Sequence, residues 1–290
     1  MNQFAIMTDS CCDLPAQMAG EMDLCVLPLA VELDGKTYYN YLDGRDISSS
    51  EFYKQLRAEK RAVTSAVSMG SYMDAMKPLL NAGQDILCLS FSSALSNTYS
   101  AAKMAAQELS LQYPDRTILV SDTLSASLGQ GLLIWLAAKE RSKGYGVREV
   151  FRWVEENKLR ICHWFTVDDL NHLKRGGRIS GAAAFFGTMM HIKPVMHVDS
   201  EGRLVPVSKA RGRKAALGAL MAEMEKTAQN PSEQTVFISH GDCLEDARTL
   251  ADMIREKMQV EEFVINPVGP VIGSHSGPNT LALFFLGSSR

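Results

Sequence analysis

The sequence lacks the features of a membrane-spanning or secreted protein. No apolar run approaches the roughly 20 residues that span a bilayer, and the N-terminal MNQFAIMTDSCCDLP has neither a basic start nor an apolar signal-peptide core. The chain also lacks a basic excess, because 30 Lys and Arg residues stand against 33 Asp and Glu residues. We therefore expect a cytoplasmic protein with no nucleic acid as partner and no stable membrane insertion, while transient membrane contact is left open.

The six cysteines form no metal or redox pattern. None lies in a C-x-x-C pair, and a chain of 290 residues needs no disulfides to hold its fold. Cys25, Cys88 and Cys162 lie in apolar runs, which is typical of small buried side chains. The adjacent Cys11 and Cys12 have no second ligand pair at a suitable spacing, so a structural role is favoured over metal binding or redox chemistry. We expect no metal and no cofactor.

The common catalytic signatures are also missing. There is no G-x-G-x-x-G, no G-x-x-x-x-G-K-[ST] and no H-E-x-x-H. GSHSG at 273–277 resembles the turn that presents a nucleophilic serine, but its central residue is His275. The sequence therefore gives no support for an enzyme.

Short apolar runs alternate with helical stretches in the first half of the chain. The runs at 4–8, 25–33, 85–91 and 117–122 are of strand length, and the segments between several of them have helical patterns. This alternation predicts a parallel sheet with right-handed crossovers. The second half differs, because extended runs on either side of residues 199–202 predict a hairpin and hence a mixed sheet. We expect one domain at 1–160 and a second at 161–290.

Hydroxyl side chains gather where predicted strands end. Ser93 and Ser96 follow the run at 85–91 and precede a helix, and Thr64 and Ser65 precede another. At the carboxyl edge of a parallel sheet such side chains, with the N-terminus of a helix, suit an anion. Each could instead be a simple helix cap, and the residues alone leave both interpretations open.

Two further segments have open interpretations. LKRGGRIS at 173–180 places Lys174, Arg175 and Arg178 around a Gly-Gly turn, which is typical of a solvated turn but also of an anion or partner site. AAAFFGTMM at 182–190 suits core packing or the lining of an adaptable apolar cavity.

Eight motifs in the same order resemble the DegV family of fatty-acid-binding proteins, which includes the FakB carriers. They are MTDSCCDLP, VTSAVS, SFSSALSNTYSAA, VSDTLSASLGQG, VDDLNHLKRGGRISG, IKPVMHVDSEGRLVP, KARGRKAA and GPVIGSHSGPNTLAL, which together extend over nearly the whole chain. The sequence departs from the family pattern at Ala66 and Val67, where the family has Gln and Pro, and at Asn97 and Asn279, where it has Gly. Asn tolerates a positive φ, so these two turns can persist.

The resemblance implies an α/β fold of two domains, an N-terminal Rossmann-like three-layer domain with a parallel sheet and a C-terminal α/β domain with a mixed sheet. It implies one long-chain fatty acid, such as hexadecanoate, held between them. The matching positions make Thr64 and Ser96 the carboxylate partners, with Ser65 and Ser93 adjacent. His275 is the motif histidine, and Arg178 is a further ligand-binding candidate.

The resemblance also implies a role without catalysis. Family members present the fatty acid to a separate fatty-acid kinase, which makes acyl phosphate for phospholipid synthesis, so we expect a binding protein with that kinase as partner. One alternative is a small-molecule kinase or transferase subunit, since the family resembles dihydroxyacetone kinases. Another is a regulatory protein that senses lipid through the same pocket.

Overall fold

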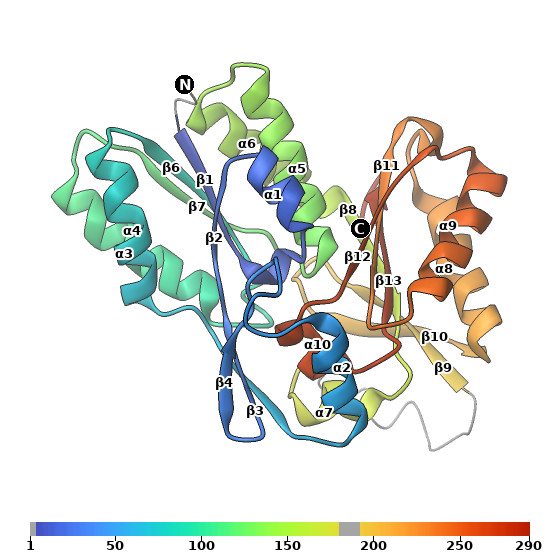
Figure 1. Cartoon of the computed structure of the whole chain (residues 1–290). Helices are drawn as coiled ribbons and strands as arrows, with labels where there is room; N and C mark the ends of the chain where they lie inside the picture. The colour runs from blue at the N-terminus through green and yellow to red at the C-terminus, as the bar shows by residue number, and fades with distance from the viewer. Residues whose placement is uncertain (1–3, 180–191) are drawn as a thin grey trace.

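The computed structural model describes residues 4–179 and 192–290. The segment 182–190, which we expected to pack in the core or to line an apolar cavity, lies outside these described residues. Figure 1 shows the parallel sheet and its helices on the left and top, and the mixed sheet with its helices on the right.

The parallel sheet predicted for the first half of the chain is confirmed. Its four strands lie in the order β2-β1-β6-β7, and all neighbours are parallel. Their bounds are β1 (Phe4–Asp9), β2 (Leu24–Leu27), β6 (Asp85–Ser90) and β7 (Ile118–Asp122). All six residues of β1 are buried, as expected for a central strand covered on both faces.

Helices cover both faces of this sheet. On one face, α3 (Met69–Asn81) and α4 (Thr98–Gln112) pack around Met7 of β1. On the other face, α5 (Leu128–Ser142) and α6 (Val147–Asn157) pack around Ile6. Because successive side chains of a strand point to opposite faces, Ile6 and Met7 bury themselves in separate clusters. This is the three-layer arrangement that the family resemblance implies.

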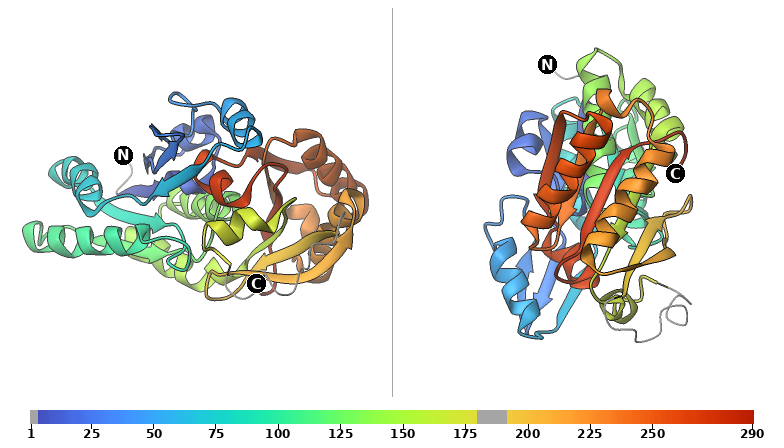
Figure 2. Two further views of the ribbon diagram at one scale, coloured as in Figure 1. Left: turned by 90° about the horizontal axis from the view of Figure 1, so that it is seen from below. Right: turned by 90° about the vertical axis from the view of Figure 1, so that its right-hand side faces the viewer.

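The second half forms the predicted mixed sheet, in the order β10-β9-β8-β13-β11-β12. Its strands are β8 (Ile161–Thr166), β9 (Ile192–Val198), β10 (Leu204–Arg211), β11 (Thr235–His240), β12 (Glu262–Pro267) and β13 (Leu281–Leu286). The predicted hairpin is β9 and β10, which pair antiparallel, whereas β11 and β12 pair parallel. Helices α8 (Arg213–Thr227) and α9 (Leu244–Met258) lie side by side over the outer face (Figure 2).

A third, antiparallel sheet of three strands was not predicted. It has the order β4-β3-β5, with β3 (Ala30–Leu33), β4 (Lys36–Tyr39) and β5 (Ala62–Ser65). Our single strand over 25–33 is therefore wrong. β2 ends at Leu27 and β3 begins at Ala30 in a different sheet, because Pro28 has no N–H to donate to a continuous ladder.

Three short helices lie to the right of this small sheet in the lower centre of Figure 1. α2 (Ser49–Arg57) is capped by Ser48, whose hydroxyl accepts from the Glu51 N–H at 3.2 Å. α10 (Pro270–Ser276) contacts α2, α7 (Leu170–Arg175), β3 and β5. The remaining bounds are α1 (Ala16–Glu21) and the 3-10 turns η1 (Ser10–Cys12), η2 (Lys158–Arg160) and η4 (Pro231–Glu233).

Helix α5 lies between the two large sheets, packing on β1 and also against β8, β11 and β13. Gly129 allows this close approach, because a Cβ there would lie 2.2 Å from Nε2 of His163. One apolar cluster consequently joins Phe4 of the first sheet to Phe284 of the second. All strands of the four-stranded sheet precede residue 160 and all those of the six-stranded sheet follow it, but the division into domains 1–160 and 161–290 stays a prediction.

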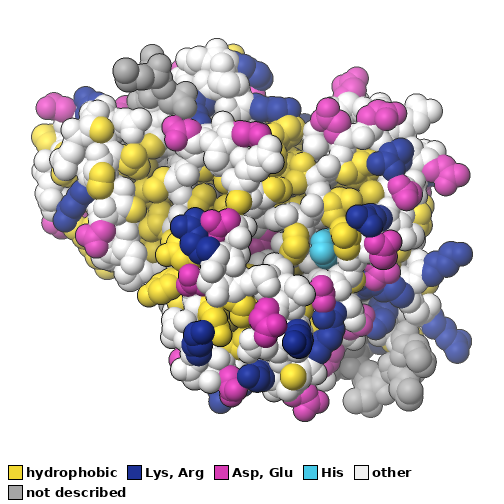
Figure 3. Space-filling model, viewed as in Figure 1, with side chains coloured by type: hydrophobic (Ala, Val, Ile, Leu, Met, Phe, Trp, Pro, Cys, Tyr) yellow, Lys and Arg dark blue, Asp and Glu magenta, His cyan; other side chains and the backbone are white. Residues whose placement is uncertain are grey.

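The surface of the described residues carries charges of both signs. On the face seen in Figure 3, Lys and Arg side chains are interspersed with Asp and Glu side chains. No helix in residues 4–179 and 192–290 is long and apolar enough to cross a bilayer.

Candidate functional site

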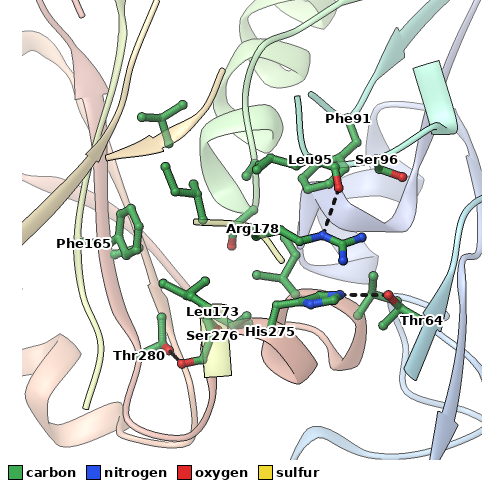
Figure 4. Close-up of a pocket in the computed structure, with 18 of the residues that line it drawn as sticks. Thr64, Phe91, Leu95, Ser96, Phe165, Leu173, Arg178, His275, Ser276 and Thr280 are labelled. Carbon is green, nitrogen blue, oxygen red and sulfur yellow. Dashed lines mark hydrogen bonds between the residues drawn. The ribbon is translucent and has the colours of Figure 1, made fainter. Parts of the chain in front are cut away.

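A cavity of about 270 Å³ is lined by strands of the three-stranded and six-stranded sheets, by α10, and by segments that follow strands of the parallel sheet. Figure 4 shows Thr64, His275, Arg178 and Ser96 on one side, together with the apolar Phe91 and Leu95, and Phe165 on the other side with Ser276 and Thr280 below it. The polar lining residues are Thr64, Ser65, Ser96, Asn97, Ser127, His163, Arg178, His275, Ser276 and Thr280. The apolar ones are Leu29, Ala66, Phe91, Leu95, Ala126, Phe165, Leu173, Val198, Leu204, Val268, Val271, Ile272, Ala282 and Phe284.

Thr64 and His275 form the hydrogen-bonded pair on the polar side. Oγ1 of Thr64, on β5, lies 2.8 Å from Nε2 of His275, near the end of α10. Gly176 gives the imidazole its space, because a Cβ there would lie 2.2 Å from Nδ1 of His275. The Gly-Gly turn noted in the sequence thus accommodates the candidate histidine, a packing reason that the sequence alone does not reveal.

Arg178 supplies the positive charge of the cavity. It follows α7, and its guanidinium lies beside the Thr64–His275 pair (Figure 4). Its Nε donates to the carbonyl of Leu95 at 3.2 Å, and Nη1 donates to the carbonyl of Gly176. Among the described lining residues Arg178 is the only Lys or Arg. These two bonds hold the half-buried guanidinium beside the polar side chains of the cavity.

The four serine and threonine candidates do not all meet. Ser65, at the exposed end of β5, and Ser96, in the loop before α4, both line the cavity with Thr64. The Ser96 hydroxyl also accepts from the Thr98 N–H at 3.3 Å, so a capping contact and a place in the cavity coexist. Ser93 is exposed and lies outside the cavity lining, with its N–H bonded to a carboxylate oxygen of Asp122 at 3.1 Å.

The side of the cavity opposite Thr64 includes a layer that the sequence analysis missed. His163 and Phe165 of β8 face Phe284 and Ala282 of β13, and the pairs are in register. The imidazole of His163 meets the ring of Phe284 edge-on, with centroids 5.3 Å apart. His163 and Phe165 are two residues apart on β8, as Ala282 and Phe284 are on β13. Because side chains two residues apart on a strand point to the same face, the sequence could have predicted that each of these pairs shares a face. The sequence does not show that this face of β8 and β13 lines a cavity, because that depends on how α5 packs against the two strands.

Both cavity histidines are held in their neutral form. Burial, with a smaller effect of the Arg178 charge, lowers the pKa of His275 to about 4. Burial also lowers the pKa of His163 well below its usual value, and its Nδ1 lies 2.9 Å from the carbonyl of Ile161. At neutral pH the cavity therefore has one charged group, Arg178, beside uncharged donors and acceptors. No group of three or more His, Cys, Asp or Glu among the described residues is arranged to hold a metal ion.

The lowered pKa of His275 predicts how stability changes with pH. Below pH 6.5 the unfolded chain takes up a proton on this side chain that the folded protein does not accept until about pH 4. The contribution of neutral His275 to stability is thus fully present above pH 6.5 and declines as the pH falls toward 4. In urea unfolding, the free energy of wild type relative to His275→Asn should fall from pH 7.5 to pH 4.5. A constant difference across this range would contradict the assignment of a buried neutral imidazole.

The two large sheets and this cavity define an α/β protein with a ligand pocket whose one cation, Arg178, lies among hydroxyl, imidazole and apolar side chains. The chain belongs to the DegV family: the model of that family, described as uncharacterised protein, DegV family, matches residues 3–288. The family membership predicted from the eight motifs is confirmed.

Relatives and solved structures match over almost the full chain. A DegV domain-containing protein from Clostridium perfringens is 46% identical over 290 residues, which cover 100% of this chain and 99% of that protein. A DegV family protein from Thermus thermophilus whose fatty acid binding has been described is 30% identical with a TM-score of 0.87, covering 98% of this chain and 99% of that chain. DegV of Bacillus subtilis, a fatty acid binding protein, is 26% identical with a TM-score of 0.83, covering 99% and 100%.

Proposed function

We propose that this protein binds a long-chain fatty acid such as hexadecanoate, between the two predicted domains. The carboxylate lies at Thr64, Ser65, Ser96, Arg178 and His275, and the tail lies against the apolar wall. The observation that carries the proposal is one cavity in which Arg178 lies beside His275 and the hydroxyls of Thr64 and Ser96 (Figure 4), while most of the lining residues are apolar. We assign no contact to Ser93, which does not line the cavity.

The chemistry of a fatty acid fits this arrangement. A carboxylate removed from water needs hydrogen bonds and a positive partner, and Arg178 with the hydroxyls of Thr64 and Ser96 can supply them. A saturated chain needs apolar surface without a reactive group, and Phe165 and Phe284 offer it. The fatty-acid binding of the Thermus thermophilus and Bacillus subtilis proteins supports the same ligand class.

The wider role proposed here is that of a carrier without its own catalysis or cofactor. Such a protein would present the bound acid to a separate fatty-acid kinase, and the acyl phosphate would enter phospholipid synthesis. We place this role in the cytoplasm, in keeping with six cysteines that are all free thiols. The order of the motifs supports this role, and co-purification with a kinase would test it directly.

Extraction of the purified protein tests the binding proposal. Organic solvent followed by mass spectrometry should recover long-chain fatty acid, and the delipidated protein should take up palmitate. Palmitate at 100 times its Kd stabilises the folded state by about 2.7 kcal/mol, so Tm should rise by several degrees. Recovery of no fatty acid together with no uptake would overturn the proposal. A Tm that instead rises with nucleotide alone would favour the kinase or transferase alternative.

Substituting the two hydroxyls separates ligand contact from helix capping. Thr64→Val and Ser96→Ala should each weaken palmitate binding by roughly 10- to 150-fold, because each removes a hydrogen bond to a charged group worth about 1.5–3 kcal/mol. Ser96→Ala should also lower stability by about 1 kcal/mol, since its hydroxyl accepts from the Thr98 N–H. The double variant should be non-additive, because both donors share one carboxylate. Calorimetry and urea unfolding measure the two effects.

Ser68→Ala is the matched control for this pair. Its hydroxyl accepts from the Ser71 N–H at 3.0 Å at the start of α3, and Ser68 does not line the cavity. This variant should lose stability without losing palmitate affinity. If Ser96→Ala behaves in the same way, Ser96 is a cap and not a carboxylate partner.

A further inference from the structure

The carboxylate of Asp13 joins three parts of the molecule although it lies outside the cavity. Asp13 directly follows η1 and is 3% exposed. Its Oδ1 accepts from the Gly269 N–H at 3.0 Å, and its Oδ2 accepts from the Ser127 hydroxyl at 2.5 Å. Its backbone carbonyl accepts from the Asn266 side chain at 2.7 Å. One residue of the N-terminal half is thus bonded to β12, to the start of α10 and to the start of α5.

Through Gly269, Asp13 fixes the start of the helix that carries His275. Gly269 immediately precedes α10, and its N–H is among those that have no partner within the helix. A Cβ on Gly269 would lie 2.7 Å from Oδ1 of Asp13, so the glycine is what lets the carboxylate approach. His275 lies six residues further on, about 9 Å along the helix axis. Asp13 therefore acts on the imidazole through the rigid helix and not by contact.

Through Ser127, Asp13 also fixes the cavity wall formed at the start of α5. Ser127 lines the cavity and has φ 53°, a left-handed conformation that is unusual for serine. Its hydroxyl lies between Oδ2 of Asp13 and the hydroxyl of Ser239, 2.8 Å away on β11. Side-chain bonds of this kind hold a residue in a conformation it would not otherwise adopt.

We propose that Asp13 is a positioning residue for the fatty-acid site, setting α10 and its His275 at a fixed place relative to α5 and the wall at Ser127. The inference rests on the proposed function. It assigns to Asp13 an effect on ligand affinity that its distance from the cavity does not suggest. The hydrogen bond from the Asn266 side chain to the Asp13 carbonyl joins Asp13 to β12 and involves neither α10 nor Ser127. A substitution of Asn266 therefore serves as a control for the loss of the two carboxylate bonds.

Asp13→Ala should remove both carboxylate bonds and loosen α10. We expect palmitate affinity to fall by at least about tenfold. Asp13→Asn should retain most of the affinity, because its amide oxygen can still accept from Gly269 and its NH₂ can donate to Ser127. Burial raises the pKa of Asp13 to about 7, so the wild-type group is already partly neutral near pH 7 and the amide resembles that form. Asn266→Ala, the control, should change affinity less than about threefold.

The imidazole signals of His275 give a readout that general destabilisation does not produce. In NMR spectra of the unliganded protein, assigned with His275→Asn, Asp13→Ala should shift these signals and move the pKa of His275 from about 4 toward 6.5. Asp13→Asn and Asn266→Ala should leave them in place. Unchanged His275 signals and an unchanged Kd in folded Asp13→Ala would overturn the proposal, as would equal losses in Asn266→Ala.

A measurement on wild type keeps the proposal testable if Asp13→Ala does not fold. Coupling between two sites is reciprocal, so palmitate should slow hydrogen exchange at the Gly269 amide by at least about tenfold. No slowing in a protein that binds palmitate would overturn the role of Asp13. Failure of wild type to bind palmitate would instead overturn the proposed function, whereas the His275 spectra of unliganded variants would still test Asp13.

Discussion

Arg178→Gln should weaken palmitate binding by roughly 10- to 150-fold. The substitution removes the only Lys or Arg among the described residues of the cavity lining, and a hydrogen bond to a charged group contributes about 1.5–3 kcal/mol. With the cation gone, the ligand carboxylate would lie beside uncharged groups only, the hydroxyls of Thr64, Ser65 and Ser96 and the neutral imidazole of His275. Isothermal calorimetry or displacement of a fluorescent fatty acid would measure the change in Kd.

Two controls tie this loss to the carboxylate. Methyl palmitate has the same tail without the charge, so its weaker binding should be nearly the same in wild type and Arg178→Gln. Arg175→Gln removes an exposed charge from the same turn, outside the cavity lining, and should leave palmitate affinity within about threefold. If Arg178→Gln binds palmitate as tightly as wild type, the carboxylate does not lie at Arg178.

Ala126→Phe should abolish binding of long-chain fatty acids while leaving the fold intact. Ala126 lines the cavity of about 270 Å³, directly before Ser127. A phenyl ring would occupy space that we assign to the tail and would gain apolar contacts there, since aromatic side chains bury about 150–250 Å². We expect no measurable palmitate uptake and a Tm for the delipidated variant at or above that of wild type.

A shorter ligand and a surface variant test whether the lost uptake is due to the filled cavity. Octanoate has a much shorter tail and needs less of the space that the ring fills, so Ala126→Phe should weaken its binding less than that of palmitate. Ala215→Phe places the same side chain on the exposed face of α8 and should leave palmitate uptake unchanged. Undiminished palmitate uptake by Ala126→Phe would show that the tail takes another route.

The regular elements of the two large sheets could be predicted because their signals are local. The apolar run that became β6 is buried from Ile86 to its end, and the hairpin of β9 and β10 turns where the extended runs flank Asp199 and Gly202. A strand that is buried on both faces needs a continuous apolar run, so such a strand can be recognised from the sequence. The small sheet escaped prediction because β4, with the sequence KTYY, is exposed or half-buried and lacks such a run.

The candidate site was predictable as a set of residues but not as an arrangement. Motif positions identified Thr64, Ser96, Arg178 and His275, yet nothing local shows that Thr64 and His275, separated by 211 positions, are hydrogen-bonded. Ser93 has the same residue type and nearly the same place in the chain as Ser96, but it lies outside the cavity lining. The segment that joins these two serines is bonded through the Ser93 N–H to Asp122, a residue 29 positions further along the chain.

By itself, then, the sequence determined the alternation of strands and helices, the family, and the residue types able to hold an anion. The tertiary structure alone decided which of those side chains share a cavity. It also decided that His163 and Phe284 form part of its far wall and that Asp13 is buried against Gly269 and Ser127. Strand and cap signals act over a few residues, whereas the cavity is lined by segments as far apart in the chain as Leu29 and Phe284, which only the packing of the whole chain brings together.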